Sequence, residues 1–398
     1  MNRRTVLFAL LYASEGAPIG FIWWALPTLL RSADLPVERI TGLTAVLLLP
    51  WVCKFLWSPL LDLLRGPRWG YRAWIMAMQT LMGVSLVPLV WLDPVAEFEW
   101  WRTLLLVHAF SAATQDAAID GLAIGAVPAA ERGRLNGAMQ AGMLAGRSVF
   151  GGGVLLLGTW FGREWIIASL ILWILAALGA AALVREAEPP GHDGVRPFLR
   201  ALSTMVRLRL TWLGLAFALV SAAGFEATGQ LAGPFLVDRG VPSSVIGVFF
   251  GFFVVASMLA GGLVGGVLSD RWGRVQAAAG SLASFVLMIV LLALADLGGG
   301  SRTVALLGIL TGMYFFVGVF TASSYAIFMD LTHPRIGATQ FSAFMAATNA
   351  CESWSAWSSG RIVASQGYPT AFLVMSAVSL AGMPLLWLMR RAARGRRR

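Results

Sequence analysis

Twelve apolar segments run through the sequence of 398 residues, and they constrain its fold more than any single motif does. Each is about 20 residues or longer, which is enough for a helix to cross the hydrocarbon core of a bilayer. Backbone groups in lipid must be hydrogen-bonded within the protein, so we expect an all-α polytopic membrane protein. The predicted spans lie near residues 5–30, 38–61, 73–92, 102–127, 135–158, 164–184, 211–237, 243–268, 275–295, 303–329, 338–362 and 368–389.

The charge pattern agrees with a membrane location. Charged residues make up only 13% of the chain, whereas a soluble domain has about 25%. The net charge of +10 does not favour nucleic-acid binding, because the arginines lie in short clusters between the apolar segments. With both termini inside, 21 arginines fall on the cytoplasmic side and six on the other, as the positive-inside rule requires. We therefore expect a multi-pass protein of a bacterial cytoplasmic (inner) membrane.

The longest polar interruption divides the predicted spans into two sets of six. Residues 1–184 would form an N-terminal six-helix bundle, 185–210 a cytoplasmic linker with a basic amphipathic helix, and 211–398 a C-terminal bundle with an arginine-rich tail. The loops of the halves echo each other, since "GGVLSDRWGR" follows span 243–268 as "SPLLDLLRGPRWGYR" follows span 38–61. Matching loops after corresponding helices indicate a pseudo-symmetric 6+6 transporter.

The loop after span 243–268 resembles a known signature. "GGVLSDRWGR" is similar to the Gly-x-x-x-Asp-Arg-x-Gly-Arg loop of the major facilitator superfamily, and the first-half copy keeps its aspartate. An aspartate at a helix end that faces loop arginines can hold two helices together in one conformer and release them in the other. The residues expected to form this conformational latch are Asp62, Asp270, Arg271 and Arg274. Small residues at 261, 262, 265 and 266 indicate close helix packing.

Lys54 is the only lysine in the chain, and it lies inside an apolar segment. Ionisable groups at bilayer depth are costly, so each needs a partner or a function. Helix rise places Lys54 and Asp120 at a similar depth, Asp116 one turn deeper, and Glu15 at a comparable level. Because a lysine can lose its proton when its partner carboxylate gains one, these four residues are candidates for a proton-coupling network. A structural Lys–Asp pair that joins two helices is an equally weighted alternative.

Three further charged residues, Arg147, Glu226 and Glu352, are expected near the bilayer midplane, where a 6+6 transporter binds its substrate. Arg147 could hold a substrate carboxylate or phosphate by two parallel hydrogen bonds. It could equally neutralise Glu352 in the empty protein, and substrate would then compete for that pair. We interpret all three as substrate-binding candidates.

The first predicted helix contains "SEGAPIGFIWWALPTLL", in which Gly16, Pro18, Gly20 and Pro27 predict a discontinuous or kinked helix. Interrupted helices free backbone groups to face a cavity. Trp23 and Trp24 could stack on an aromatic or sugar ligand, or could anchor the helix at the membrane interface.

A longer stretch is more specific. Residues 110–153, "FSAATQDAAIDGLAIGAVPAAERGRLNGAMQAGMLAGRSVFGGG", together with "KFLWSPLLD", resemble the peptide–acetyl-coenzyme A transporter branch of the superfamily. That branch includes AmpG-type muropeptide permeases and importers of siderophores such as pyochelin and rhizobactin. The resemblance implies proton-driven import of a bulky polar conjugate, and it adds Gln115 to the candidate substrate-binding residues.

The leading functional hypothesis is a proton-coupled importer of a siderophore, in its ferric or free form. The alternative is an anhydromuropeptide permease of cell-wall recycling, and a receptor or acyltransferase on the same scaffold ranks third. An enzyme is not expected, because no nucleophile–base constellation is present. The expected partners are a small-molecule substrate, protons and the lipid bilayer, with no nucleic acid, no cofactor and no metal, and the protein is expected to be a monomer.

Overall fold

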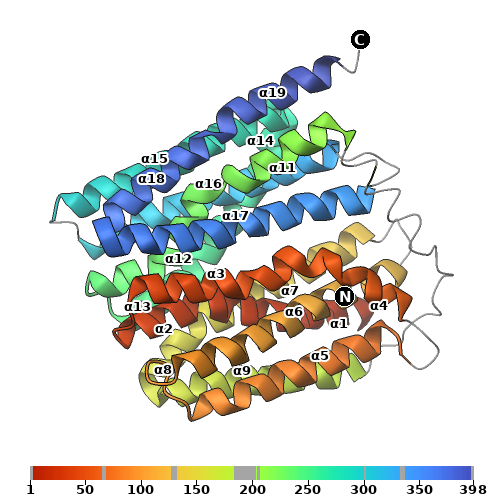
Figure 1. Ribbon diagram of the computed structural model, residues 1–398, viewed down its shortest axis with the longest axis vertical. Coiled ribbons are helices and arrows are strands. Elements are labelled where there is room, and N and C mark those ends of the chain that lie inside the picture. Colours follow the sequence, from red (N-terminus) through yellow and green to blue (C-terminus); the bar gives the residue numbers. More distant parts are fainter. Residues whose placement is uncertain are drawn as a thin grey trace. The chain divides into compact units, whose positions relative to one another are not determined.

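The computed structural model describes residues 3–64, 69–126, 132–182, 203, 207–299, 302–331 and 337–395, and all regular secondary structure in these ranges is helical (Figure 1). Most of the predicted linker and the end of the tail therefore lie outside the described residues. The helices of the first half are α1 (Arg3–Gly20), α2 (Leu26–Ser32), α3 (Val37–Cys53), α4 (Ser58–Leu63), α5 (Tyr71–Leu86), α6 (Phe98–Ala126), α7 (Arg132–Ser148), α8 (Val154–Phe161) and α9 (Arg163–Ala182).

The second half repeats this alternation of long helices and short turns. Its helices are α11 (Arg209–Val220), α12 (Ala223–Asp238), α13 (Ser243–Val248), α14 (Val255–Trp272), α15 (Arg274–Leu297), α16 (Thr303–Leu331), α17 (Gly337–Gln366), α18 (Tyr368–Leu380) and α19 (Gly382–Gly395). Short 3₁₀ turns at Lys54–Leu56 (η2) and Val87–Val90 (η3) extend α3 and α5.

Ten helical stretches of the described chain are long and apolar enough to cross a membrane. Each coincides with one predicted span, with ends that differ by a few residues. The other two predicted spans are α6 and α17, which are continuous helices of 29 and 30 residues. These two helices are less apolar than the other ten, because they contain ionisable and amide side chains, including Asp116, Asp120 and Glu352.

The chain forms two compact units, which do not follow its halves strictly. The first comprises Met1–Leu35, Cys53–Asp193 and Gly240–Phe252, and the second comprises Pro36–Val52, Gly194–Arg239 and Phe253–Arg398. Most of α3 therefore packs with α17 in the second unit. Along one face of α3, Ala45 O accepts a hydrogen bond from Ser353 Oγ (2.8 Å), and Glu38 pairs with Arg361 (3.5 Å). The predicted domain boundaries at 184 and 211 remain a prediction.

Close backbone packing joins α1 to α7 inside the first unit (Figure 1). A Cβ atom at Gly16 would collide with the backbone of Met143, and one at Gly142 would collide with the backbone of Ala9. Small residues allow such approach in lipid, where van der Waals contact replaces the hydrophobic effect as the force between helices. The glycines thus fix the position of α1, which contributes several residues to the polar centre described below.

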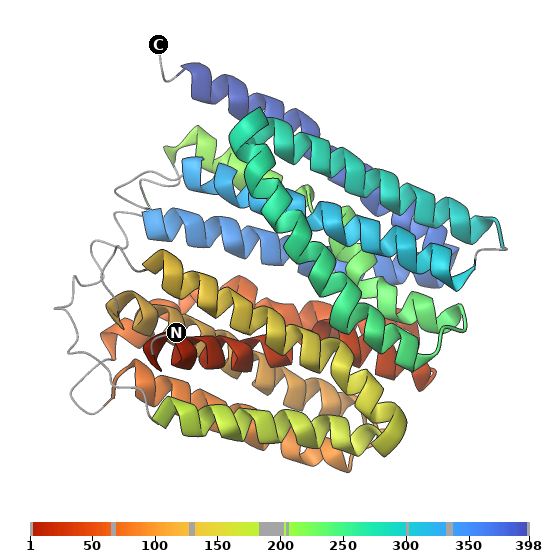
Figure 2. The same ribbon diagram turned by 180° about the vertical axis from the view of Figure 1, so that it is seen from behind.

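The second unit uses the same device between α14 and α16, which can be followed in Figure 2. Cβ atoms at Gly261 and Gly265 would collide with backbone carbonyls of Phe315 and Val319. Gly262 and Gly266 face open space. The expected close packing is therefore confirmed for one of the two overlapping pairs of small residues.

Within the described residues, three π-helical turns interrupt the long helices, at Phe21–Ala25 (η1), Val149–Gly153 (η5) and Phe249–Val254 (η6). Turns of this kind are rare and often occur at functional sites. The first lies between α1 and α2, and the chain stays helical through it from Thr5 to Ser32, so a kink or discontinuity of the first helix stays a prediction. In the first unit η1 packs against η5, and Trp24 stacks on Phe250 with ring centroids 5.6 Å apart.

Candidate functional site

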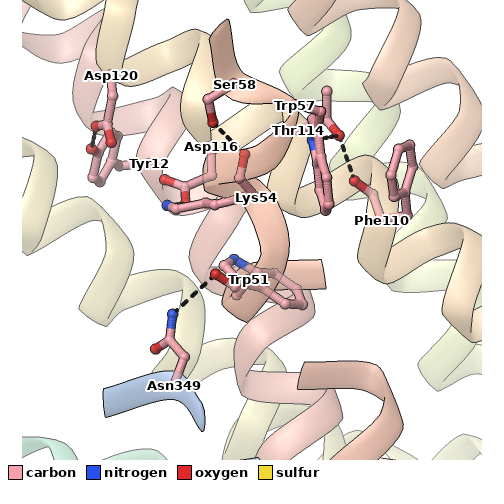
Figure 3. A network of polar contacts seen from close by, with 10 residues as sticks. All are labelled: Tyr12, Trp51, Lys54, Trp57, Ser58, Phe110, Thr114, Asp116, Asp120 and Asn349. Atoms are coloured by element: carbon pink, nitrogen blue, oxygen red, sulfur yellow. Dashed lines mark hydrogen bonds and ion pairs between the residues drawn. The ribbon is translucent and has the colours of Figure 1, made fainter. Parts of the chain in front are cut away.

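The lone lysine forms an ion pair with Asp116 (Figure 3). The Lys54 side chain is 28% exposed and that of Asp116 is 8% exposed, so the pair is largely removed from solvent. Lys54 opens the 3₁₀ turn η2, which the Ser58 hydroxyl stabilises by donating to Lys54 O at 2.7 Å. Two of the predicted proton-coupling residues are thus brought together.

The other two predicted members of the proton-coupling network, Asp120 and Glu15, lie on α6 and α1. Asp116 and Asp120 are one turn apart on α6, and Tyr12 and Glu15 are one turn apart on α1. Tyr12 donates its hydroxyl hydrogen bond to Asp120, and Glu15, one turn further along α1, lies level with Asp116 on the antiparallel α6. Glu15 is 3% exposed, whereas Asp120 is exposed. The antiparallel helices α1 and α6 therefore form a two-step polar ladder, which Lys54 completes at the Asp116 step.

Three carboxyl groups, those of Glu15, Asp116 and Asp120, share one ammonium, that of Lys54, in this cluster. An uncompensated charge at bilayer depth is costly, so the charge balance favours a proton on one of the carboxyl groups. The geometry can store a proton next to an ion pair.

Ser14 orders the next layer of the same cluster. Its hydroxyl donates to Leu11 O (2.7 Å) and accepts from Gln79 Nε2 (3.2 Å) and Gln115 Nε2 (3.3 Å). A hydroxyl has one donor and two acceptor positions, so Ser14 is saturated and fixes the orientation of both amides. All three side chains are at most 1% exposed. Gln115, predicted as a substrate-binding residue, is thus part of the buried support of the ladder; its role toward substrate stays a prediction.

Trp57 and Phe110 form an aromatic pair near the Lys54–Asp116 ion pair. Trp57 Nε1 donates to Thr114 Oγ1 at 3.1 Å, and its ring lies 4.9 Å from that of Phe110 (Figure 3). Thr114 precedes Asp116 by two residues, so the indole ties η2 to the part of α6 that carries the ion-pair partner.

Arg147 lies at the end of α7, beside the π turn η5. Its guanidinium carbon is 5.8 Å from the ring centroid of Trp24, a cation–π distance, and among the described residues its buried Nε has no hydrogen-bond partner. Trp24 is 6% exposed and already stacks on Phe250, so its observed contacts are internal; Trp23 is partly exposed. Roles for Arg147 and the two tryptophans in substrate binding remain predictions.

The predicted residues Glu226 and Glu352 occupy α12 and α17 of the second unit. Glu352 accepts a hydrogen bond from Gln230 Nε2 at 2.9 Å, and Glu226 lies one turn before Gln230 on α12. Arg147 belongs to the first unit, so its suggested pairing with Glu352 is not described and stays a prediction.

The predicted latch residues are placed as follows. Arg274 pairs with Asp330 at the end of α16 and donates to Ala326 O at 3.0 Å, while Asp270 and Arg271 are exposed at the end of α14. Asp62 lies in α4, and its side chain is outside the described part of the chain. The observed partner of the loop arginine is thus Asp330, and the latch itself remains a prediction.

Several residues of the two polar centres were not identified from the sequence. They are Tyr12, Ser14, Gln79 and Trp57 in the first unit and Gln230 in the second. All are neutral, so a search restricted to ionisable residues in apolar segments passes over them. Spacing offers one usable signal, because Tyr12 lies three residues before Glu15 and Gln230 four residues after Glu226, on the same helix faces.

Comparison with known proteins places this arrangement in a family. The sequence matches the profile of the Major Facilitator Superfamily over residues 8–350. The chain belongs to the major facilitator superfamily. It is therefore a multi-pass membrane transporter with the all-α fold of that superfamily, located in the cytoplasmic membrane.

Relatives of known name within this superfamily align along nearly the whole chain. The anhydromuropeptide permease of Escherichia coli K12 is 26% identical over 406 residues, covering 97% of this chain and 80% of the permease. A putative transporter named AmpG 4 from Rickettsia conorii is 22% identical, covering 94% of this chain and 93% of its own length. The resemblance to the AmpG-type branch is confirmed by these matches.

Solved structures of the superfamily share the fold at low sequence identity. A D-xylose–proton symporter superposes with a TM-score of 0.78 at 12% identity and covers 96% of both chains. A bacterial homologue of the human lysosomal transporter Spinster, in an inward-facing unoccupied conformation, gives 0.76 at 14% identity, covering 97% of this chain and 96% of that one. At such identity the likeness concerns the fold alone.

Proposed function

We propose that this protein is a proton-coupled importer of anhydromuropeptides. The proposal adopts the alternative of the sequence-based hypotheses, because the aligned relatives include an anhydromuropeptide permease and a putative transporter named AmpG 4. The observation that carries the coupling part is the Lys54–Asp116 ion pair, one turn from Asp120 with its hydrogen bond from Tyr12.

Coupling follows from the charge balance of the ladder. Asp120 is its exposed member, so an entering proton meets this carboxylate first and can pass to the buried Asp116 one turn away. A proton on Asp116 removes the charge that holds the Lys54 ammonium. Lys54 then loses its ion-pair partner and gives up either its position or its own proton. Because Lys54 belongs to η2, this event loosens the junction between α3 and α4 and can change the positions of these two helices.

The test is uptake of radiolabelled anhydromuropeptide into proteoliposomes under an imposed pH gradient. We expect accumulation that collapses with a protonophore and that excess ferric pyochelin does not reduce. Accumulation of the siderophore without accumulation of the muropeptide would transfer the proposal to the other substrate. Equal accumulation with and without the gradient would refute proton coupling.

Lys54→Arg separates a switch from a structural pair. An arginine keeps the ion pair with Asp116 but stays protonated at any accessible pH. We expect this variant to bind substrate and to lose gradient-driven accumulation. Glu38→Gln, at an exposed ion pair outside the cluster, is the matched control and should transport normally. If Lys54→Arg accumulates substrate like the wild type, the pair is structural.

A further inference from the structure

The second unit contains a polar group that the coupling scheme does not use. Gln230 is 2% exposed, and its amide nitrogen donates to Glu352 Oε1 at 2.9 Å. Among the described residues, the Oε1 atom of the same amide is buried and has no hydrogen-bond partner. A carboxylate can only accept, so the amide must present its N–H to Glu352 and leave its oxygen as an open acceptor.

Two carboxylates accompany this acceptor. Glu226 lies one turn before Gln230 on the same face of α12, and Glu352 comes from α17, which packs against α12. The Gln230–Glu352 hydrogen bond joins the two helices at this point, and both carboxylate side chains are partly exposed. The region therefore combines a buried amide oxygen with accessible carboxylates.

The base of this region is packed. Ala222, Ala223 and Cys351 form a buried apolar cluster beneath it, against which Phe225 and Trp354 pack. Trp354 Nε1 donates to Leu219 O at 2.9 Å and so fixes α17 against α11. The acceptors consequently keep their positions without a ligand, which lowers the ordering cost of binding.

We propose that Glu226, Gln230 and Glu352 form a binding site for a primary ammonium group. An ammonium has three N–H donors and no acceptor, which matches two carboxylates and one amide oxygen. Its charge offsets the acidic pair, whereas a substrate carboxylate would be repelled. The inference rests on the proposed function only in naming the molecule, where the ammonium would be a free amine of the peptide portion.

A matched pair of small probes tests the site without any transport. Nα-acetyl-lysine amide has one ammonium and no other charge, and its Nε-acetylated form has the same backbone without the charge. We expect the first compound to raise the thermal unfolding temperature of the detergent-solubilised protein, and the second to leave it unchanged. Equal shifts for both compounds, or no shift for either, would overturn the proposal.

Variants locate the effect. Glu226→Gln and Glu352→Gln should each abolish the ammonium-dependent shift, and Glu38→Gln in the same unit should keep it. If Glu352→Gln does not fold, Glu226→Gln decides alone, because the Gln230–Glu352 hydrogen bond is retained in that variant. A shift that survives in Glu226→Gln would also overturn the proposal.

The same chemistry can be followed in transport, where failure of the two proposals is distinguishable. We expect anhydromuropeptide uptake to fall at least tenfold after acetylation of its free amines. If the untreated compound is not accumulated, the proposed function fails while the probe experiment still decides the ammonium site. If the acetylated compound is accumulated as well as the untreated one, the ammonium site fails and the proposed function stands.

Discussion

The polar centres of the two units differ in what balances their carboxylates. In the first unit, Asp116 has a charged partner in Lys54, and the neighbouring Asp120 receives a hydrogen bond from Tyr12. In the second unit, Glu352 receives a hydrogen bond from the neutral amide of Gln230. A centre that contains its own cation can exchange a proton without a ligand, whereas the open amide oxygen of Gln230 is suited to accept from a cation of a ligand. We therefore propose coupling in the first unit and recognition in the second.

The largest effect is expected where the internal cation is removed. Lys54→Ala leaves Asp116 without its charged partner, which should cost about 3–5 kcal/mol of stability and abolish accumulation. The double variant Lys54→Ala/Asp116→Ala should recover most of the stability but no coupling. Chemical unfolding in detergent and proteoliposome uptake measure the two quantities. Wild-type stability of Lys54→Ala would mean that the first unit does not depend on its own cation.

The Ser14 layer should give the next largest effect. Ser14→Ala removes the acceptor of two buried amide donors, Gln79 and Gln115, so we expect a loss of about 1–3 kcal/mol in unfolding free energy. Ser281→Ala is the matched control in the second unit, because that buried serine bonds only to carbonyls of its own helix. Similar losses in the two variants would contradict the supporting role of Ser14.

Removal of the amide in the second unit should cost less. Gln230→Leu deletes one hydrogen bond to Glu352, whose partial exposure lets water replace it, so a loss of about 0.5–1.5 kcal/mol is expected. The same variant should lose the ammonium-dependent thermal shift. A stability loss as large as that of Lys54→Ala would erase the distinction between the two centres.

The smallest effect concerns a loop carboxylate outside the bilayer. Backbone N–H groups of Ala96 and Val95 donate to Asp93 and lower its pKa below the usual 3.8. Because the folded-state pKa is lowered, the stabilisation is present above pH 3.8 and is lost as the pH falls through the folded value. Asp93→Asn should therefore reduce the acid sensitivity of unfolding slightly. If the unfolding free energy of Asp93→Asn falls at acid pH as steeply as that of the wild type, Asp93 does not contribute to the acid sensitivity.

The helices were predictable because each has enough apolar residues to cross a bilayer, and α6 and α17 were found despite their polar residues. The pairing at the site was predictable only to within a turn. Uniform helix rise put Lys54 level with Asp120, yet its partner is Asp116, one turn deeper. The 3₁₀ turn at Lys54 rises about 2.0 Å per residue in place of 1.5 Å, and the long side chain extends further, so both carry the ammonium deeper.

The neutral members of the site could not be found from the sequence for a different reason. A tyrosine, a serine or a glutamine in an apolar segment costs little enough to occur without a function. Tyr12 and Gln230 are therefore indicated only by their helical spacing from a glutamate, and Ser14 is not indicated until the neighbouring helix is in place. The packing of α3 within the second unit could not be predicted from the sequence either. It depends on Ser353 and Arg361, which are about 300 residues away in the chain.

The π turns have a consequence for how this chain tolerates deletions. A π turn contains one more residue than the α-helical turn it replaces. Loss of one residue within 21–25 would convert that turn to regular helix and leave the residues on either side facing as before. Loss of one residue elsewhere in α1 would rotate everything beyond it by about 100° and turn Tyr12 or Glu15 away from α6. The interrupted segment is thus the place where the first helix can be shortened without losing the register of its polar face.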